Sequence, residues 1–394
     1  MRLLHLADLH LGFRQYQRLT PGGINQREAD VARTFETAID RAIETAPEVI
    51  VIAGDVFHSV RPSNPAILHS FIHFARLMQA LPKTRVVMVA GNHDLPRSSE
   101  TGCILQLFSR LGMDVVDREA QRISIPEYDL SVLAVPHSTA PTLDPDPAFS
   151  HNVLVMHAEI EGMIPMAGAT AERASLIIPQ SAIDTSKWSY VALGHYHVYR
   201  KLDENMFYSG STDYTSTNHW GELHEERVSG IDGKGFVEWH FETRTALFRP
   251  LPRSRNFVDL PPISAEGLSV SEIDDQIRQH VDGFPGGIDD RVVRLRLHDM
   301  PRHVARELDQ RAIREYKKRA LNFFLDIRRP ENVQRSASGA PGRRPTLDEV
   351  LQSWLATRLI PVEVDRARLI DLGVRYLAEA DALGVPAAAA APEV

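Results

Sequence analysis

Short apolar runs separated by longer amphipathic stretches dominate the first part of the chain. Val49–Ala53 is an unbroken apolar run rich in β-branched residues, which is typical of a strand buried on both faces of a sheet. Arg2–Ala7 and Arg85–Ala90 have the same character. Helices are predicted between these runs, over Asn25–Ala46 and Pro65–Leu81. The order strand, helix, strand, helix, strand indicates an α/β fold.

The first predicted helix carries a clear start signal and a clear apolar face. Asn25 is a preferred N-cap residue, and Glu28 follows it three positions later. Phe35, Ile39 and Ile43 recur every four residues, so they form a stripe that faces a core. Local sequence therefore predicts both the beginning of this helix and the side that it buries.

Beyond about residue 120 the pattern is richer in strands than in helices. The predicted strands are Gln121–Ile125, Leu130–Pro136, Val153–Met156, Trp188–Leu193, Val198–Leu202, Met206–Tyr208, Arg227–Ile231 and Gly235–Phe241. We therefore expect a first domain over residues 1–247, with helices flanking a β-sandwich.

A smaller α+β domain is predicted for residues 248–330, where prolines first become frequent. Ser269 and Glu272 form a capping box ahead of a helix. From Val293 to His298 apolar residues alternate with basic ones, which predicts a half-buried strand with a basic outer face. One further helix is predicted through Val304–Ala320, and a last alternating strand at Phe323–Ile327.

The last part of the sequence predicts a tether followed by two amphipathic helices. Residues 331–345 are rich in Ser, Gly and Pro, as in a flexible linker. Thr346 and Glu349 form another capping box, and a second helix carries Leu369, Leu372 and Tyr376. These helices form either a small subdomain packed on the body or a docking element for another protein. The tail from residue 387 to 394 is expected to be disordered.

Composition and charge set limits on the class of protein. The 394 residues are 43% hydrophobic and 24% charged, as in ordinary globular proteins. The single Cys103 excludes an internal disulfide framework and a thiolate metal cluster. The start of the chain meets a charge too early for a signal peptide, and no apolar run is long enough to span a bilayer. We therefore expect a cytoplasmic protein without a membrane partner.

The net charge of −8 argues at first against a nucleic-acid partner, but the charge is unevenly distributed. Residues 291–330 hold twelve Lys or Arg and five Asp or Glu, a net of +7, so the rest carries −15. Part of this basic excess falls at helical i,i+4 spacing with Glu and would form solvated pairs. DNA affinity, if present, must then come from this local basic segment or from a partner.

Metal-ligand side chains follow several of the predicted strands. They are Asp8, His10, Asp55, Asn92, His93, Asp94, His157, His195 and His197, and glycine precedes three of these groups. Asp8 with His10, and His195 with His197, are two positions apart and are expected to share a face. Because ligand sites of α/β sheets collect at the carboxyl ends of strands, these side chains are expected to converge. Carboxylate, amide and imidazole ligands suit Mn²⁺, Fe or Zn better than Ca²⁺.

We interpret Asp55 as a carboxylate shared between two metal ions. It directly follows a strand that is predicted to be buried on both faces, where water would not solvate a charged side chain. A shared carboxylate can hold two cations roughly 3.5–4 Å apart, the spacing used for displacement at phosphorus. His5 lies inside a predicted strand and is expected to be structural.

With these motifs in order, the chain resembles the calcineurin-like metallophosphoesterase superfamily. Asp55–Ser63 and Leu11–Tyr16 are similar to the SbcD branch of DNA double-strand-break repair nucleases. Phosphoprotein phosphatases of the superfamily would carry Asp where His58 stands. The motifs cover roughly residues 1–220, and we find no sharp motif in the basic domain or the terminal helices.

The resemblance implies roles for individual residues. One ion would be held by Asp8, His10, Asp55 and His197, and the other by Asp55, Asn92, His157 and His195. His93 would protonate or stabilise the leaving oxygen, and His58 would orient the phosphate or the bound strand. Asp94 is expected behind His93, where it would fix the tautomer of that ring. Arg61, Arg294 and Arg296 are candidate DNA contacts.

The resemblance also implies two Mn²⁺ ions as cofactors and DNA as substrate. The expected activity is exonucleolytic at duplex ends and endonucleolytic in single strands and hairpins. A coiled-coil ATPase of the SbcC type would bind the terminal helices, within a region of residues 346–394, and the protein would form a homodimer. Two alternatives stay open: a small-substrate phosphodiesterase on the same fold, and a non-catalytic scaffold.

Overall fold

The computed structural model describes residues 1–96, 102–137, 142–162, 177–330, 346–358 and 364–382. The chain divides into two compact units, Met1–Arg329 and Pro330–Val394. The predicted tether at 331–345 and the predicted disordered tail lie outside the described residues. Within the part of the chain that is described, no helix has the length and apolar character needed to cross a membrane.

The first sheet is built on the three apolar runs that open the chain. Its strands are, in spatial order, β14 (Thr245–Pro250), β13 (Gly235–His240), β1 (Arg2–Leu6), β2 (Val49–Ala53), β3 (Arg85–Val89) and β4 (Asp114–Val116). From β1 to β4 neighbouring strands are parallel, whereas β13 pairs antiparallel with β1 and β14 pairs antiparallel with β13. All five residues of β2 are buried, which confirms the prediction of a strand covered on both faces.

The second sheet is also mixed, with a parallel centre and antiparallel edges. Its strands are, in spatial order, β11 (Arg200–Asp203), β12 (Met206–Tyr208), β10 (Tyr190–Gly194), β7 (His151–His157), β6 (Leu130–Val135) and β5 (Gln121–Ile125). The strands β6, β7, β10 and β12 run parallel, and β11 and β5 close the two edges. A short parallel pair, β8 (Glu159–Ile160) and β9 (Ile177–Ile178), lies beside it.

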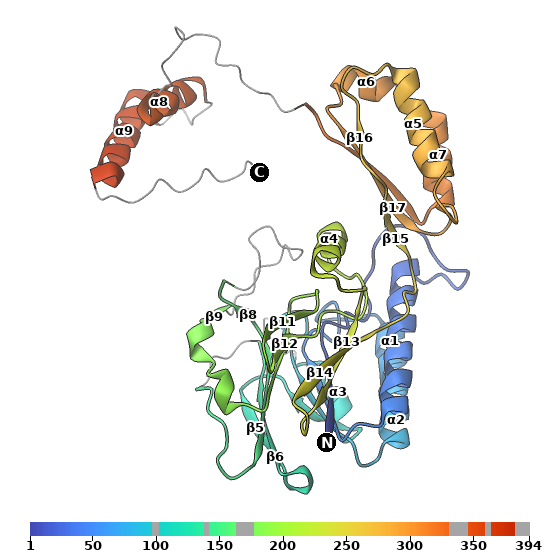
Figure 1. Ribbon diagram of the computed structural model, residues 1–394, viewed down its shortest axis with the longest axis vertical. Coiled ribbons are helices and arrows are strands. Elements are labelled where there is room, and N and C mark those ends of the chain that lie inside the picture. Colours follow the sequence, from blue (N-terminus) through green and yellow to red (C-terminus); the bar gives the residue numbers. More distant parts are fainter. Residues whose placement is uncertain (97–101, 138–141, 163–176, 331–345, 359–363, 383–394) are drawn as a thin grey trace. The chain divides into compact units, whose positions relative to one another are not determined.

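The two sheets pack face to face, and helices cover the outer face of the first (Figure 1). Side chains at alternating positions of both sheets, including Val51, Val87, Val155 and Phe207, form one buried cluster between them. The opposite face of the first sheet packs on α1 (Gln26–Thr45), α2 (Asn64–Ala80) and α3 (Gln106–Ser109). The expected β-sandwich with flanking helices is thus the observed architecture, and it brings the carboxyl ends of β1, β2, β3, β7 and β10 to the same region.

Local signals predicted most element boundaries correctly. Asn25 caps α1 by accepting the backbone N–H groups of Arg27 and Glu28. The capping boxes of Ser269 and Thr346 both form. His5 is fully buried with its Nδ1 3.0 Å from the Tyr190 hydroxyl, so the structural role expected for it is confirmed.

The predicted strand at 227–231 is wrong, because the segment belongs to helix α4 (His219–Ser229). Asn218 caps this helix, and Gly230, in the left-handed conformation, ends it. The helix buries His219, Trp220, Glu222 and Glu226, and only one of these four residues is apolar. An apolar stripe was therefore absent from the sequence, and hydrophobic periodicity could not reveal the helix.

The predicted α+β unit forms around a parallel sheet with its own buried core. Its elements are β15 (Phe257–Asp259), β16 (Ile263–Ser264), α5 (Val270–Asp282), β17 (Val292–His298), α6 (Arg302–Glu307), α7 (Gln310–Arg319) and β18 (Asn322–Ile327). The single helix predicted at 304–320 is two helices, because Asp309 caps α7 and interrupts the run. The predicted division after residue 247 falls inside β14, so that strand continues the sandwich to Pro250; the four-part division of the chain otherwise stays a prediction.

The second unit contains the two predicted helices, α8 (Leu347–Thr357) and α9 (Arg366–Ala382). Gly373 of α9 approaches Leu351 and Leu355 of α8, so the two helices pack on each other. Several large apolar side chains stay exposed, among them Val350, Trp354 and Tyr376.

Candidate metal centre

The predicted ligands sit in turns that follow the strands, several of them in a strained backbone conformation. Asp8, His10 and Asp55 have φ of 52°, 45° and 52°, and His195 has φ of 100°. Left-handed backbone is unfavourable for residues with a side chain, and such strain concentrates at functional sites. The first two turns are tied together, because the Asp8 N–H donates to Gly54 O at 3.0 Å and the His10 N–H donates to Asp55 O at 2.9 Å.

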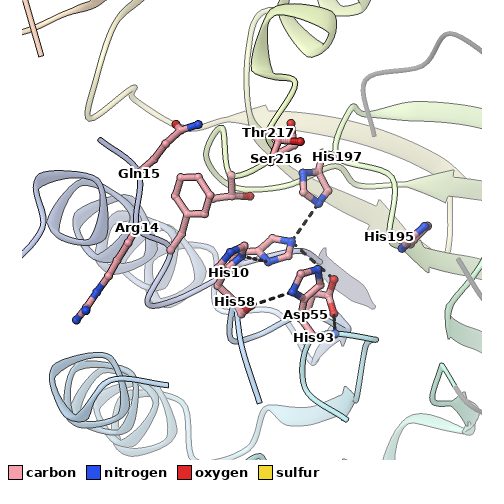
Figure 2. Close-up of a pocket in the computed structure, with 12 residues that line it drawn as sticks. His10, Arg14, Gln15, Asp55, His58, His93, His195, His197, Ser216 and Thr217 are labelled. Carbon is pink, nitrogen blue, oxygen red and sulfur yellow. Dashed lines mark hydrogen bonds and ion pairs between the residues drawn. The ribbon is translucent and has the colours of Figure 1, made fainter. Parts of the chain in front are cut away.

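The expectation that ligands two residues apart share a strand face is wrong. β1 ends at Leu6 and β10 at Gly194, so neither pair lies on a strand. The rings of His195 and His197 are directed to different neighbours (Figure 2). Turn geometry, rather than strand alternation, therefore brings these side chains into the site.

A first cluster gathers around His10. Its Nε2 lies 3.0 Å from Nε2 of His197 and 3.7 Å from Oδ2 of Asp55. Asp8, His10 and His197 each offer a ligand atom within 4.8 Å of the others, and all three are buried. The Asp8 carboxylate also accepts the backbone N–H of His195, at 3.0 and 3.1 Å.

A second cluster gathers around His157 and shares Asp55 with the first. Nε2 of His157 lies 3.0 Å from Oδ1 of Asn92 and 3.4 Å from Oδ2 of Asp55. Nδ1 of His195 lies 3.3 Å from the same Asn92 oxygen. The structure thus brings together all seven side chains that the sequence predicted as metal ligands, and Asp55 lies between the two clusters.

The atoms of these clusters have the chemistry that a cation site requires. Nδ1 of His157 is 2.8 Å from the carbonyl oxygen of Ala53, so that nitrogen carries the ring proton. In the neutral ring, Nε2 then presents a lone pair to Asn92 Oδ1 and to Asp55, and these electron-pair donors repel unless a cation or a proton lies between them. The ligand atoms of His10 and His197, and of His157 and Asn92, lie 3.0 Å apart, a separation that two metal bonds of about 2.0–2.2 Å can bridge. The residues therefore fit a pair of divalent ions.

The pKa values show how strongly the buried charges interact. Burial by itself would raise the pKa of Asp55, but the facing His157 and His10 lower it well below its usual value. Burial would lower the pKa of His157, and the Asp55 charge instead raises it to about 9. Burial raises the pKa of Asp8 to about 6 and, with the Asp55 charge, that of Asp94 to about 7. Buried carboxylates and imidazoles from different turns therefore interact strongly at this site.

His58 and His93 lie together beside the first cluster. Nδ1 of His58 is 3.3 Å from Nδ1 of His10, and the rings of His58 and His93 stack with centroids 5.1 Å apart. Nδ1 of His93 lies 2.8 Å from the His58 carbonyl oxygen, and its backbone N–H donates to Asp55 at 2.9 Å (Figure 2). His10, His58 and His93 also form a group whose ring nitrogens lie within 4.8 Å of one another.

Asp94 has a different position from the one expected. Its carboxylate accepts the backbone N–H groups of Val56, Phe57 and Gly91 at 2.9–3.2 Å. These contacts hold the turn after β2 against the turn after β3, while the carbonyl of His58 lies at Nδ1 of His93. Asp94 therefore fixes the backbone that carries Asp55, rather than the tautomer of His93.

Glycine is required before these ligands because a Cβ would clash with neighbouring atoms, at least as much as because the backbone turns there. A Cβ at Gly54 would lie 2.3 Å from Nδ1 of His157, and one at Gly91 would lie 2.1 Å from Oδ1 of Asp55. A Cβ at Gly194 would lie 1.8 Å from the carbonyl oxygen of Ala53. Of the three, only Gly54 has a positive φ, of +88°. The ligands can approach one another this closely only because the residues at Gly54, Gly91 and Gly194 have no side chain.

The pocket over the clusters has a rim of residues that were not assigned to the site from the sequence, although half of them lie in the Leu11–Tyr16 stretch. It is lined by Phe13, Arg14, Gln15, Thr215, Ser216 and Thr217 together with the histidines. His137, also missed, is buried with its ring 5.7 Å from that of His157. Its position directly after the apolar run 130–136 was the available signal. Glu222 and Lys234, buried behind His197, carried no such signal.

The three arginines named as DNA contacts lie in different environments. Arg61 is exposed in the loop before α2. Arg294 pairs with Asp259 through two contacts of 3.0 and 2.8 Å, and Arg296 lies 3.4 Å from the same carboxylate. The guanidinium of Arg294 also covers the Trp220 ring at 4.7 Å. DNA would have to compete with Asp259 for both residues of β17.

The sequence of this chain is similar to one described family and to several DNA repair proteins. The family model described as calcineurin-like phosphoesterase matches residues 1–199. The DNA double-strand break repair protein Mre11 of Methanocaldococcus jannaschii is 29% identical over 254 residues, which are 60% of this chain and 61% of that protein. Proteins of the same name from Methanosarcina mazei and Sulfolobus acidocaldarius are 26% identical over 370 residues and 29% over 208 residues. The alignment with the Methanosarcina mazei protein covers 80% of this chain and 55% of that protein. The alignment with the Sulfolobus acidocaldarius protein covers 51% of this chain and 50% of that protein. The chain therefore spans about half to three fifths of the length of these relatives.

Proposed function

The chain belongs to the calcineurin-like phosphoesterase family, and we propose that it is a metal-dependent DNA nuclease subunit of a double-strand-break repair complex of the SbcCD type. The observation that carries the proposal is the convergence of two clusters of ligands on Asp55, next to a pocket lined by His10, Asp55, His195 and His197 among others. The name shared by the relatives, DNA double-strand break repair protein, supports DNA as the substrate. The proposed activity is exonucleolytic at duplex ends and endonucleolytic in single strands and hairpins.

In this proposal Asp8, His10, Asp55 and His197 hold one ion, and Asp55, Asn92, His157 and His195 hold the other. Mn²⁺ is the proposed metal, since mixed nitrogen and oxygen ligands suit it. Two bound divalent ions neutralise the charge of the phosphodiester and activate the nucleophile. The protein contributes the strained turns and the spaces left by glycine, which hold the ligands at fixed positions before any ion arrives.

His93 is the proposed acid for the leaving oxygen, and His58 orients the phosphate. Because Nδ1 of His93 lies 2.8 Å from the His58 carbonyl, its Nδ1–H tautomer is fixed, and the proton for the leaving group is exchanged through Nε2. The His58 ring stacks on His93 and meets the edge of Phe13, with ring centroids 4.9 Å apart, so its orientation is constrained on two sides.

The proposed partners bind residues other than those of the two clusters. A coiled-coil ATPase of the SbcC type docks on the terminal helices, where Trp354 and Tyr376 are 48% and 59% exposed. A homodimer forms through α2, which exposes Leu68 and Ile72 at 61% and 52%. Arg61 and β17 contribute DNA contacts, and a cytoplasmic location stays a prediction from the sequence.

The experiment that tests the proposal is cleavage of end-labelled duplex, hairpin and single-stranded DNA in Mn²⁺. Asp55→Asn is expected to abolish cleavage, and His93→Asn to slow it about 10²- to 10⁴-fold, the range for loss of a general acid. Asp232→Asn is the matched control, because that carboxylate is 95% exposed and pairs only across the surface with Arg253. Cyclic-nucleotide hydrolysis with intact DNA would instead favour a small-substrate phosphodiesterase, and a failure to bind metal would favour a scaffold.

A further inference from the structure

His197 is held from behind by a buried group of charged side chains. Its Nε2 faces His10, whereas its Nδ1 is buried and makes no hydrogen bond within the described residues. Oε1 of Glu222 lies 3.6 Å from that Nδ1. The backbone carbonyl of His197 accepts a hydrogen bond from the Lys234 ammonium at 2.7 Å.

Glu222 itself is anchored on every side. It is fully buried on α4, pairs with Lys234 through Oε2, and accepts the Ser216 hydroxyl at Oε1. Lys234 pairs also with Glu226, at 3.0 Å, and its ammonium lies 4.7 Å from the centroid of the Tyr214 ring. The Lys234 ammonium at Oε2 and the Ser216 hydroxyl at Oε1 therefore hold the carboxylate at a fixed distance from the imidazole.

We infer that Glu222 is a positioning residue for His197, an assignment that rests on the proposed role of His197 as a metal ligand. When Nε2 of an imidazole binds a cation, its proton must reside on Nδ1, and a carboxylate there fixes the tautomer and strengthens the ligand. Glu222 Oε1 stands at that atom. The distance of 3.6 Å exceeds a hydrogen bond by a few tenths of an ångström, so a slight ring rotation completes the contact.

The charge of the cluster agrees with this role. Lys234 pairs with both Glu222 and Glu226, so its single positive charge does not by itself balance the carboxylate that faces His197. A buried carboxylate is costly unless a positive charge lies close by, and a cation at Nε2 on the far side of the ring would supply one.

Glu226 provides a matched control on the same helix. Its carboxylate contacts Lys234 at 3.0 Å and the Tyr214 hydroxyl at 2.5 Å, one turn beyond Glu222. Glu226→Gln therefore removes one buried charge from the same cluster, whereas Glu222→Gln removes the charge that faces His197. Glu222→Asp keeps a charge near Lys234 but withdraws the carboxylate from His197 by one methylene.

The test measures Mn²⁺ binding to the full chain by electron paramagnetic resonance of free Mn²⁺, without DNA. We expect Glu222→Gln and Glu222→Asp each to weaken one of two sites by about 10- to 100-fold, the usual effect of removing a partner behind a metal-binding histidine. Glu226→Gln is expected to change the affinity by less than about threefold, although thermal unfolding in chelator should reveal similar losses of stability for both Gln variants.

Equal affinities of the wild type and the two Glu222 variants would overturn the assignment, as would an equal loss in Glu226→Gln. If the Glu222 variants do not fold, NMR of the His197 ring in the unmutated Zn²⁺-loaded protein decides: a deshielded, slowly exchanging Nδ1–H, as in a hydrogen bond to a carboxylate, supports the assignment, and a fast-exchanging Nδ1–H or an Nε2–H refutes it. A wild type that binds two Mn²⁺ but leaves DNA intact would refute the nuclease and not the positioning role. A wild type that cuts DNA, beside Glu222 variants with unchanged Mn²⁺ affinity, would refute only the positioning role.

Discussion

Replacing Gly91 with alanine is expected to disable the site through the movement of Asp55. An alanine Cβ at this position would lie 2.1 Å from Oδ1 and 2.5 Å from the backbone nitrogen of Asp55. Ordinary non-bonded contacts are about 3.5 Å, so the two segments must separate by roughly 1 Å. The backbone of Gly91 does not have a positive φ, and hence the predicted effect is steric rather than conformational.

The size of the effect depends on the tight coupling of the two turns. Asp94 bonds to both Gly91 N–H and Phe57 N–H, and Asp55 accepts the His93 N–H, so the turns cannot move apart without loss of these contacts. Overpacking of this kind costs about 1–3 kcal/mol of folding free energy. A displacement of about 1 Å in a reacting site costs on the order of 100-fold in rate. Activity should therefore fall far more than stability.

The assay combines Mn²⁺ titration, cleavage of labelled duplex DNA and urea unfolding in chelator. Gly22→Ala is the control, because a Cβ there would meet nothing nearer than the Thr20 hydroxyl at 3.9 Å and the backbone is unstrained. The control should keep full activity. A Gly91→Ala protein with wild-type Mn²⁺ affinity and wild-type cleavage would refute the close approach of the two turns on which the site depends.

Three further predictions concern metal, buried charge and the contact between α4 and the α+β unit. Chelation should lower the melting temperature, since each ion at 100 times its Kd contributes about 2.7 kcal/mol. Arg27→Ala should destabilise the fold by about 3–5 kcal/mol in urea unfolding, because Arg27 is fully buried between Asp30 and Asp213 and its loss leaves buried charge unpaired. Trp220→Ala should weaken Mn²⁺ binding by roughly 2- to 30-fold, corresponding to a coupling of about 0.5–2 kcal/mol, because Trp220 holds α4, and with it Glu222, against Arg294.

Each of these has a result that would contradict it. A melting curve unchanged by chelator would speak against any metal in the folded protein. Arg41→Ala, which breaks an exposed pair with Glu44, should cost less than about 1 kcal/mol, and an equal cost for Arg27→Ala would remove the case for the buried network. Unaltered Mn²⁺ affinity in Trp220→Ala would show that the contact between α4 and the α+β unit is not coupled to metal binding.

The apolar runs and caps of this chain were sufficient to predict the central strands of both sheets, the two longest helices of the sandwich and the polar residues that follow the strands. Val49–Ala53 could only be a buried strand, and the residues directly after a buried parallel strand lie at the ligand-binding edge of its sheet. Asn25, Ser269 and Thr346 marked helix starts because capping is a local interaction between a side chain and the next turn. The residues that could act as ligands were named from the sequence because they directly follow such strands.

Local patterns predicted that these side chains converge, but not how each is aimed, because their orientation depends on contacts between segments far apart in the chain. Left-handed turns, rather than strand alternation, aim Asp8 and His10, and these turns are held by backbone hydrogen bonds to the turn after β2. Helix α4 has no apolar stripe, so its burial is decided by pairing with Lys234 and by packing against the α+β unit. Sequence by itself thus determined which side chains are available for chemistry, since propensity and periodicity act over a few residues. Tertiary structure alone decided which of them face one another, because charges and rings separated by many tens of residues meet only after both sheets have packed.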